Sequence, residues 1–278
     1  MSSLSDLARI YSASFIRQII SSGYQPLLDE LSKSFEFVKE ANINGDFRLL
    51  FDEAYSILLK HYRCEYIYKS ELYGKMKKES RKKMKNGILT EVKSGSCVAD
   101  LLWLNGTSIA YEIKTEIDNN RRLANQINSY QQLFKQTMVV SYEKNIELIL
   151  SQVPNHVGIM FLSKRGALKV YREAGEYTNE LNPGSMFLTL RRHEYEAVIK
   201  EAYGDVPRVS DAFIFEECLK LFKELEPLDA HDLMVKQLKL RAQAKIDNSF
   251  VWPKSIRFLL ERGSLKRSEV LQFRRIIH

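Results

Sequence analysis

The sequence predicts an α/β protein, and three observations support this prediction. Short runs rich in β-branched and aromatic residues occur between residues 88 and 171, alternating with patterns of helical spacing. The dipeptide Asn105-Gly106 separates two apolar runs, as expected for the turn of a β-hairpin. The flanking sequences repeat apolar residues at helical spacing. We therefore expect an N-terminal helical region over residues 1–60, an α/β core over 61–175 and a C-terminal helical region over 185–278.

The composition is that of an ordinary globular protein. Its 278 residues can bury a substantial core, and 42 Lys and Arg against 35 Asp and Glu give a formal net charge of +7, a mild indication of a polyanionic partner. The widely spaced Cys64, Cys97 and Cys218 match neither a disulfide framework nor a Cys-x-x-Cys metal site. Without a signal-peptide pattern or a long apolar run, we expect a cytoplasmic protein that does not enter the membrane.

The first elements are expected to be helices. Apolar spacing predicts a helical pair over residues 1 to about 45, separated near Gly23 and Pro26. A longer helical pattern begins at Asp46, and the segment from Arg63 to Tyr73 either continues it or begins a new helix.

Three glutamates on these helices are candidates for an acidic site residue. Glu65 lies beside an apolar stripe that begins at Tyr66, so its side chain could face the core. Glu53 and Glu71 compete with it, and the helical pattern does not rank the three.

Residues 75–85 form the densest basic run, in which seven of eleven residues are Lys or Arg. One interpretation is a set of phosphate contacts along a groove, and the other is a solvated connector between a helix and a strand. The candidate phosphate contacts are Lys75, Lys77, Lys78, Arg81, Lys82 and Lys83.

The central segment, from residue 88 to residue 171, is predicted to form strands and one helix. We expect a first strand over residues 88–93, the hairpin over 98–114, and a helix over 121–134 with Asn119 or Asn120 as N-cap. Further strands are expected over 137–142, 157–162 and 167–171. Beyond about residue 187, proline-punctuated helical patterns cover 193–203, 211–224, 230–245 and a last pair within 255–278.

The hairpin carries three charges in apolar surroundings, Asp100, Glu112 and Lys114. Such charges are costly to bury unless they are paired or bind a metal. Glu112 and Lys114 are two residues apart and share a face of their strand. A two-residue loop would place Asp100 opposite Tyr111, on the other face, whereas a three-residue loop or a β-bulge would place it opposite Glu112. A metal site therefore predicts an irregular hairpin.

With both carboxylates on one face, Asp100 and Glu112 would supply the hard oxygen ligands that Mg²⁺ or Mn²⁺ prefers, and the carbonyl of Ile113 could complete the set. The metal would polarise a scissile phosphate and lower the pKa of a bound water. Lys114 is suited to orient that water or to neutralise developing charge.

This pattern resembles the PD-(D/E)XK nuclease superfamily. That superfamily has an aspartate opening its second core strand and Glu-x-Lys on the third, here Ala99-Asp100 and Tyr111-Glu112-Ile113-Lys114. Gln126-Ile-Asn-Ser-Tyr130 resembles the QxxxY motif of the RecB-like branch, and Ala99 replaces the usual proline. The resemblance covers about residues 60–175. This stretch looks like a bacterial group within the superfamily. It implies a restriction-endonuclease-like core, in which helices flank a central mixed sheet.

The resemblance also implies roles for further residues. Gln126 and Tyr130 would approach the metal site and position the bound strand. An acidic residue is expected on the first core helix, and we assign this role to Glu65, with Glu91 on the first strand as the alternative, also as a metal ligand. Arg121 and Arg122 are either phosphate contacts or ordinary surface charges.

The expected function is therefore Mg²⁺- or Mn²⁺-dependent cleavage of nucleic acid, with DNA favoured over RNA by the resemblance. One alternative is a non-catalytic nucleic-acid-binding module of the same fold. Another is a nuclease subunit that works only within a larger defence or mobile-element complex. The C-terminal helices are candidates for contact with a protein partner or a second copy of the chain.

Overall fold

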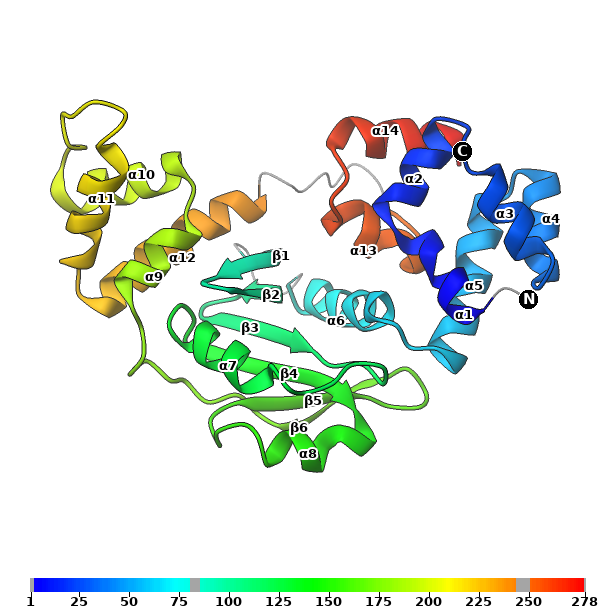
Figure 1. Cartoon of the computed structure of the whole chain (residues 1–278), viewed down its shortest axis with the longest axis horizontal. Helices are drawn as coiled ribbons and strands as arrows, with labels where there is room; N and C mark the ends of the chain where they lie inside the picture. The colour runs from blue at the N-terminus through cyan, green and yellow to red at the C-terminus, as the bar shows by residue number, and fades with distance from the viewer. Residues whose placement is uncertain (1–2, 81–85, 244–250, 278) are drawn as a thin grey trace.

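The computed structural model describes residues 3–80, 86–243 and 251–277. Its centre is a six-stranded mixed sheet in the order β1-β2-β3-β4-β5-β6, flanked by helices, so the predicted α/β class is confirmed (Figure 1). The strands are β1 (Gly87–Ser94), β2 (Cys97–Leu104), β3 (Ser108–Ile113), β4 (Gln136–Tyr142), β5 (Gly158–Leu162) and β6 (Leu168–Arg172).

The helices precede, cross and follow the sheet. Those before it are α1 (Leu4–Ala8), η1 (Arg9–Tyr11), α2 (Ala13–Ile20), α3 (Gln25–Ser32), α4 (Glu36–Asn44), α5 (Phe47–His61) and α6 (Glu65–Ser80). Those between strands are α7 (Leu123–Gln131), η2 (Glu143–Asn145) and α8 (Ile146–Leu150). Those after it are α9 (Pro183–Thr189), α10 (Arg192–Tyr203), α11 (Ile214–Lys223), α12 (Pro227–Gln243), α13 (Lys254–Arg262) and α14 (Arg267–Ile276). The segment after Arg63 thus begins a new helix, whereas α9 was not predicted.

The strand order follows from the connections. β1, β2 and β3 are joined by short turns and pair antiparallel. β3, β4 and β5 pair parallel, because α7 and then α8 carry the chain back across the sheet. β6 returns antiparallel to β5.

The β2–β3 hairpin has a three-residue loop. Its last pair is Leu104 with Ser108, which leaves residues 105–107 in the turn, where Gly106 has φ 110°. The ladder begins at the pair Leu101–Tyr111, and its register, continued by one position, would set Asp100 opposite Glu112. The irregular hairpin that the sequence predicted is therefore confirmed.

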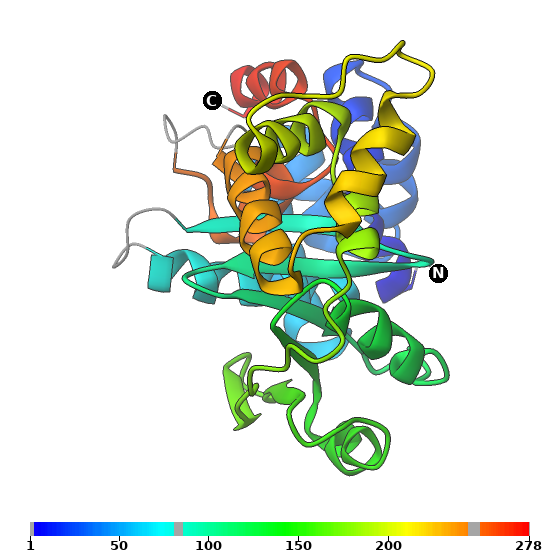
Figure 2. The same ribbon diagram turned by 90° about the vertical axis from the view of Figure 1, so that its left-hand side faces the viewer.

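The two faces of the sheet bury different helices. On one face, side chains such as Trp103, Tyr111 and Ile113 pack with α5, α6 and α13. On the other face, Leu102 and Ala110 pack with α7 and with the group α9–α12, while α8 covers β4 and β5. Figure 2 shows α12 in front of the strands and the N-terminal helices behind them.

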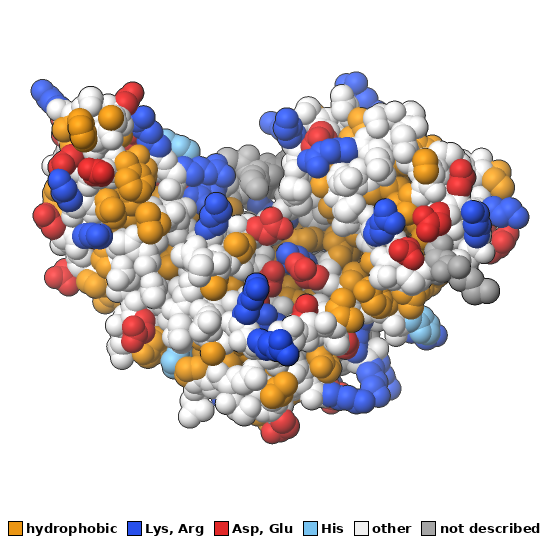
Figure 3. Space-filling view, viewed as in Figure 1, with side chains coloured by type: hydrophobic (Ala, Val, Ile, Leu, Met, Phe, Trp, Pro, Cys, Tyr) orange, Lys and Arg blue, Asp and Glu red, His pale blue; other side chains and the backbone are white. Residues whose placement is uncertain are grey.

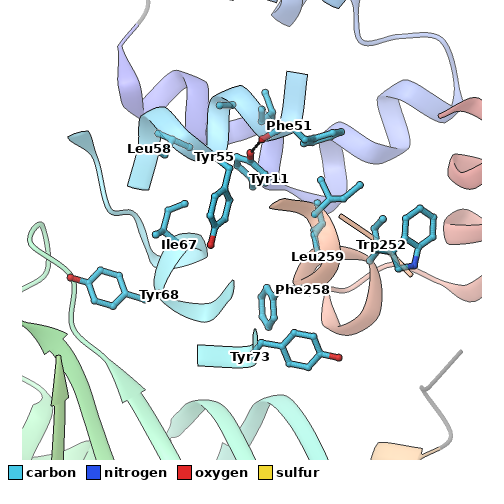
Figure 4. Close-up of a cluster of buried hydrophobic side chains, with 14 of the residues drawn as sticks. Tyr11, Phe51, Tyr55, Leu58, Ile67, Tyr68, Tyr73, Trp252, Phe258 and Leu259 are labelled. Carbon is cyan, nitrogen blue, oxygen red and sulfur yellow. Dashed lines mark hydrogen bonds between the residues drawn. The ribbon is translucent and has the colours of Figure 1, made fainter. Parts of the chain in front are cut away.

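The helices at the two ends of the chain form one aromatic core. Tyr11, Phe51, Tyr55 and Phe258 lie close together in Figure 4, although they come from η1, α5 and α13. The Tyr11 hydroxyl donates a hydrogen bond to the carbonyl of Phe51. Helix α13 also contacts α5, which attaches it to the N-terminal helices.

The C-terminal helices therefore divide between two groups. Helices α13 and α14 contact α6 and α2, whereas α9 and α12 contact β1. Figure 3 shows these groups as two masses beside a hollow, with acidic and basic side chains gathered at the centre of this view. Within residues 3–80, 86–243 and 251–277, no helix combines the length and hydrophobicity that crossing a membrane needs.

Candidate catalytic site

Glu112, at the end of β3, is buried among polar side chains. Its Oε1 lies 2.9 Å from the Nζ of Lys114 and accepts a hydrogen bond of 2.5 Å from the Nε2 of Gln126. Its Oε2 accepts one of 2.6 Å from the Tyr130 hydroxyl. A carboxylate that is 3% exposed needs such partners. The structure thus brings together Glu112, Lys114, Gln126 and Tyr130, as the sequence predicted.

Helix α7 supplies two of these partners because Gln126 and Tyr130 are one turn apart on the same face. The helix is fastened to the end of β1 by two hydrogen bonds. The Ser94 Oγ donates to the Ser129 carbonyl at 2.7 Å, and the Ser129 Oγ donates to the Ser94 carbonyl at 2.5 Å. Burial and the neighbouring Glu112 carboxylate raise the pKa of Tyr130, so its hydroxyl remains a donor.

The expected N-cap of this helix was wrong. Helix α7 begins at Leu123 after Arg122, and no side chain caps it. Asn120 instead donates to the Oδ1 of Asn145 at 3.1 Å, and Asn145 donates to the Ser141 Oγ at 2.9 Å. This chain of amides continues to the site, because the Ser141 Oγ donates to the Lys114 carbonyl at 2.6 Å.

Lys114 is fixed by its backbone and by its side chain. Its N–H donates to the Val140 carbonyl at 2.9 Å, and its Nζ donates to the Oε1 of Gln126 at 2.8 Å. The ammonium group is therefore held between the Glu112 carboxylate and the Gln126 amide, with 7% of the residue exposed.

Asp100 takes a position between the strands. Its Oδ2 accepts a 2.8 Å hydrogen bond from the Ile113 N–H, while its Oδ1 lies 3.5 Å from the Nζ of Lys69 on α6. Glu112 meets α7, so the two carboxylates are approached from opposite faces rather than sharing one face as expected. The reason is that the Asp100 side chain turns toward an N–H that the ladder leaves open. Burial and the Glu112 charge raise the pKa of Asp100 to about 7.

Lys69 was not identified from the sequence. It is buried, and its Nζ contacts Glu65 as well as Asp100, with the Oε1 of Glu91 at 4.0 Å. Burial lowers the pKa of Lys69, but the Asp100 and Glu65 charges outweigh this effect and leave the pKa raised. The sequence feature that could have identified Lys69 is its position on the apolar stripe of α6 that includes Tyr66.

Both leading candidates for the additional acid reach this region. Glu65 and Glu91 contact Lys69 with side chains that are 57% and 68% exposed. Glu91 has φ 53°, a strained conformation for this residue, and it lies opposite Asp100 in the β1–β2 register. Glu71 instead pairs with Lys254 at 2.5 Å, and Glu53 is exposed on α5.

These contacts define a strand-end cluster. Its members are Glu65, Lys69, Glu91, Asp100, Glu112, Lys114, Gln126 and Tyr130. With all groups ionised, its four carboxylates and two lysines leave two negative charges in excess. Hard oxygens with such an excess are the donor set that suits Mg²⁺ or Mn²⁺, although no group of three His, Cys, Asp or Glu side chains with metal-binding geometry occurs among the described residues.

The predicted basic residues separate into two places. Arg121 and Arg122 line a cavity of about 370 Å³ together with Lys114 and Asn119, directly beside the cluster. Lys75, Lys77 and Lys78 lie at the other end of α6 and line a different cavity of about 830 Å³. Lys75 pairs with Glu79, and Lys77 pairs with Glu261, so part of their charge is already neutralised. Arg81, Lys82 and Lys83 lie outside the described residues.

A protein-family match covers the part of the chain that contains the cluster. The family of the bacteriophage P4 protein cII matches residues 59–256, more than two thirds of the sequence. The chain belongs to the bacteriophage P4 protein cII family. No curated protein and no solved structure matches it. The P4 cII family region runs from the end of α5 into α13 and contains every member of the strand-end cluster.

The P4 cII family region contains a second buried polar network, at the turn end of the hairpin. The Ser108 Oγ lies 2.7 Å from the Nε2 of His231, whose Nδ1 lies 2.8 Å from the Oδ1 of Asp232. Lys135 donates its backbone N–H to the Ser108 Oγ at 3.0 Å and its Nζ to Asp232 at 3.1 Å. Ser108, Lys135, His231 and Asp232 form this turn-end network, which the sequence did not reveal because Ser108 and His231 are 123 positions apart.

Proposed function

We propose that this member of the P4 cII family is a Mg²⁺- or Mn²⁺-dependent nuclease that hydrolyses phosphodiester bonds, in DNA rather than RNA. One observation carries the proposal. Lys114, Gln126 and Tyr130 converge on the buried Glu112, and Asp100 lies near enough for the Glu112 charge to help raise its pKa. The order α6, β1–β3, α7, β4 also agrees with the restriction-endonuclease-like core that the sequence resemblance implies.

Asp100 and Glu112 would hold the cation, with the Ile113 carbonyl, water and a substrate phosphate as further oxygen ligands. Glu65 or Glu91 would add an acidic group at the exposed side of the cluster. When bound, the cation supplies Lewis-acid chemistry, because it draws electron density from the phosphate and from water. The raised pKa of Asp100 supports this assignment, since a divalent cation would relieve the repulsion between the two carboxylates.

Lys114 would orient the attacking water and stabilise the negative charge that develops on phosphate. The water would lose a proton to solvent as its oxygen bonds to phosphorus, and the leaving sugar oxygen would take up a proton from solvent as its bond to phosphorus breaks. Gln126 keeps the Lys114 ammonium and the Glu112 carboxylate in place, because its amide bonds to both. Tyr130 holds the second oxygen of Glu112 and would bring α7 close to the bound strand.

Phosphate contacts are proposed for Arg121 and Arg122. Both line the cavity that also contains Lys114, so a backbone phosphate there would meet three cationic side chains. The excess of seven positive charges over the whole sequence supports a polyanionic substrate. Cytoplasmic action remains the expectation, since all three cysteines are free thiols.

The second candidate is a nuclease subunit that acts within a larger assembly of a mobile element. The name of the family, which refers to a bacteriophage protein, favours this candidate over the non-catalytic module. Such a subunit would bind the cation but cleave little DNA on its own.

The test is nicking of supercoiled plasmid DNA by the purified full chain with Mg²⁺ or Mn²⁺. We expect the wild type to nick and Lys114→Ala to lose cleavage while its circular dichroism and melting temperature remain close to wild type. The matched control is Lys169→Ala, which removes an exposed lysine from β6 and should cleave normally.

Each other outcome has a defined meaning. Equal cleavage by wild type and Lys114→Ala indicates a contaminating nuclease and contradicts the proposal. Mn²⁺ binding without cleavage favours the subunit. Absence of Mn²⁺ binding in calorimetry favours the non-catalytic nucleic-acid-binding module.

A further inference from the structure

We propose that Lys69 controls how tightly the strand-end cluster binds its divalent cation, because the Lys69 ammonium group holds Asp100 in the metal-free protein and must withdraw when the cation binds. This inference rests on the proposed function. It assigns a regulating role to a residue outside the Asp100, Glu112 and Lys114 set.

The two oxygens of Asp100 have different partners. Its Oδ2 is engaged by the Ile113 N–H, so its Oδ1 is the oxygen left for a cation. That oxygen lies 3.5 Å from the Nζ of Lys69. An ammonium group and a divalent cation beside the same oxygen would repel each other strongly, because the site is shielded from water. Lys69 and the cation therefore compete for Asp100.

The other contacts of Lys69 provide a place for it to go. Its Nζ also pairs with Glu65, one helical turn earlier on α6, and lies 4.0 Å from Glu91. Both glutamates are more than half exposed, so they border solvent. Because the lysine stem has four rotatable bonds, the ammonium group can leave Asp100 and keep Glu65 as its partner.

The backbone at this point is also unusual. Glu91 has φ 53° and faces Asp100 in the β1–β2 register, between the pairs Thr90–Leu101 and Val92–Ala99. Strained conformations of this kind persist where other interactions determine the structure, and they concentrate at binding sites. Lys69 contacts this strained residue, Glu91. A cation at Asp100 would therefore rearrange the contacts that Lys69 makes with Glu91 and with the other carboxylates.

Lys114 differs from Lys69 in its partners. Lys114 donates to the neutral amide of Gln126 as well as to Glu112, and its backbone is fixed to β4. The three contacts of Lys69 are all carboxylates. We therefore assign Lys114 to the reaction and Lys69 to competition with the cation.

The test is Mn²⁺ binding to the full chain by titration calorimetry, without nucleic acid. Lys69→Met removes the charge and keeps the apolar stem, and we expect it to bind Mn²⁺ at least about tenfold more tightly than wild type. Lys69→Arg keeps the charge and should bind with wild-type affinity. Metal-free Lys69→Met should melt at a lower temperature than wild type, and Mn²⁺ should raise its melting temperature by more.

Further variants keep the result decisive. If Lys69→Met does not fold, Lys69→Gln provides a second neutral side chain for the same measurement. Asp100→Asn should abolish Mn²⁺ binding in both the wild-type and the Lys69→Met backgrounds, which shows that the cation occupies this site.

Equal or weaker Mn²⁺ binding by folded neutral variants would overturn the role of Lys69 and leave the proposed nuclease function standing. If neither wild type nor any Lys69 variant binds Mn²⁺, or if Asp100→Asn binds it normally, both proposals are wrong. Mn²⁺ binding by Lys69→Met but not by wild type would support both the inference and the metal site, so only the absence of binding in both proteins favours the non-catalytic module.

Discussion

The two ends of the β2–β3 hairpin both bury polar groups, but they differ in charge. At the turn end, burial lowers the pKa of His231, so the ring is neutral and bonds to the fully buried Ser108. The acid of that network, Asp232, is 69% exposed and paired with Lys135. At the strand end, Asp100 and Glu112 are shielded from water, and the cluster retains an excess of negative charge.

This difference separates a structural network from a candidate site. In the turn-end network the buried Ser108 and the neutral His231 are hydrogen-bonded, as folding requires of buried polar groups, and the exposed Asp232 is paired with Lys135. Buried charge costs free energy even where it is paired, and such arrangements concentrate where function needs them. Ser108 contacts His231 and His231 contacts Asp232, as in the serine, histidine and aspartate triad of hydrolases. However, the serine has no access to solvent. The strand-end cluster is therefore the better candidate.

The largest expected effect separates the two ends by activity. Glu112→Gln keeps the shape of the side chain but removes the charge that positions Lys114, so we expect Mn²⁺-dependent plasmid nicking to fall by about 10² to 10³. Ser108→Ala, at the other end of the same hairpin, should leave nicking within about twofold of wild type. Similar losses in both variants would show that the whole hairpin, rather than its strand end, determines activity.

The pH dependence of stability should also come from the strand end. The pKa of Asp100 rises from 3.8 to about 7 on folding, so the folded state binds the proton more tightly. This contribution to stability is complete below pH 3.8 and is lost as the pH rises through about 7.

Urea unfolding without metal, from about pH 5 to about pH 8, measures this effect. Wild type should lose stability relative to Asp100→Asn, which does not titrate. His231→Gln, at the turn end, removes an opposing contribution, because the lowered pKa of His231 favours folding more as the pH rises. This variant should therefore lose more stability than wild type over the same range. Parallel curves for wild type and Asp100→Asn would show that Asp100 ionises normally.

A smaller effect tests the structural role of the turn end. Ser108→Ala leaves the His231 Nε2 and the Lys135 N–H without their shared partner, so we expect the free energy of unfolding to fall by about 1–3 kcal/mol. Ser56→Ala, an exposed helical serine, serves as the control with little expected change. A loss below about 0.5 kcal/mol in Ser108→Ala would contradict the structural role.

The smallest effect concerns the turn itself. Gly106 has φ 110°, and no atom lies within 4 Å of an added Cβ, so Gly106→Ala should cost about 1 kcal/mol through backbone strain alone. Because the apolar faces of the strands hold the register, Mn²⁺ affinity should stay unchanged. Weaker Mn²⁺ binding in this variant would mean that the turn, rather than the strands, holds Asp100 opposite Glu112.

Much of the fold follows from local patterns. The strands expected over 88–93, 137–142, 157–162 and 167–171 each correspond to an observed strand, because buried strands need continuous or alternating apolar residues. The helix bearing Gln126 and Tyr130 was likewise predicted, although its N-cap was not. The boundaries of the three predicted regions remain predictions. Helices α13 and α14 lie within the predicted C-terminal region but contact helices that precede the sheet.

The sequence by itself determined which side chains the hairpin carries and that Glu112, Lys114, Gln126 and Tyr130 could meet, since these relations depend on spacing within one strand or one helix. It left two loop lengths open for Asp100. The tertiary structure decided between them, because Trp103 and Tyr111 must face one core while Leu102 and Ala110 face the other. It also brought Lys69 to Asp100 and His231 to Ser108. Such contacts depend on how helices pack on a sheet, which no local spacing specifies.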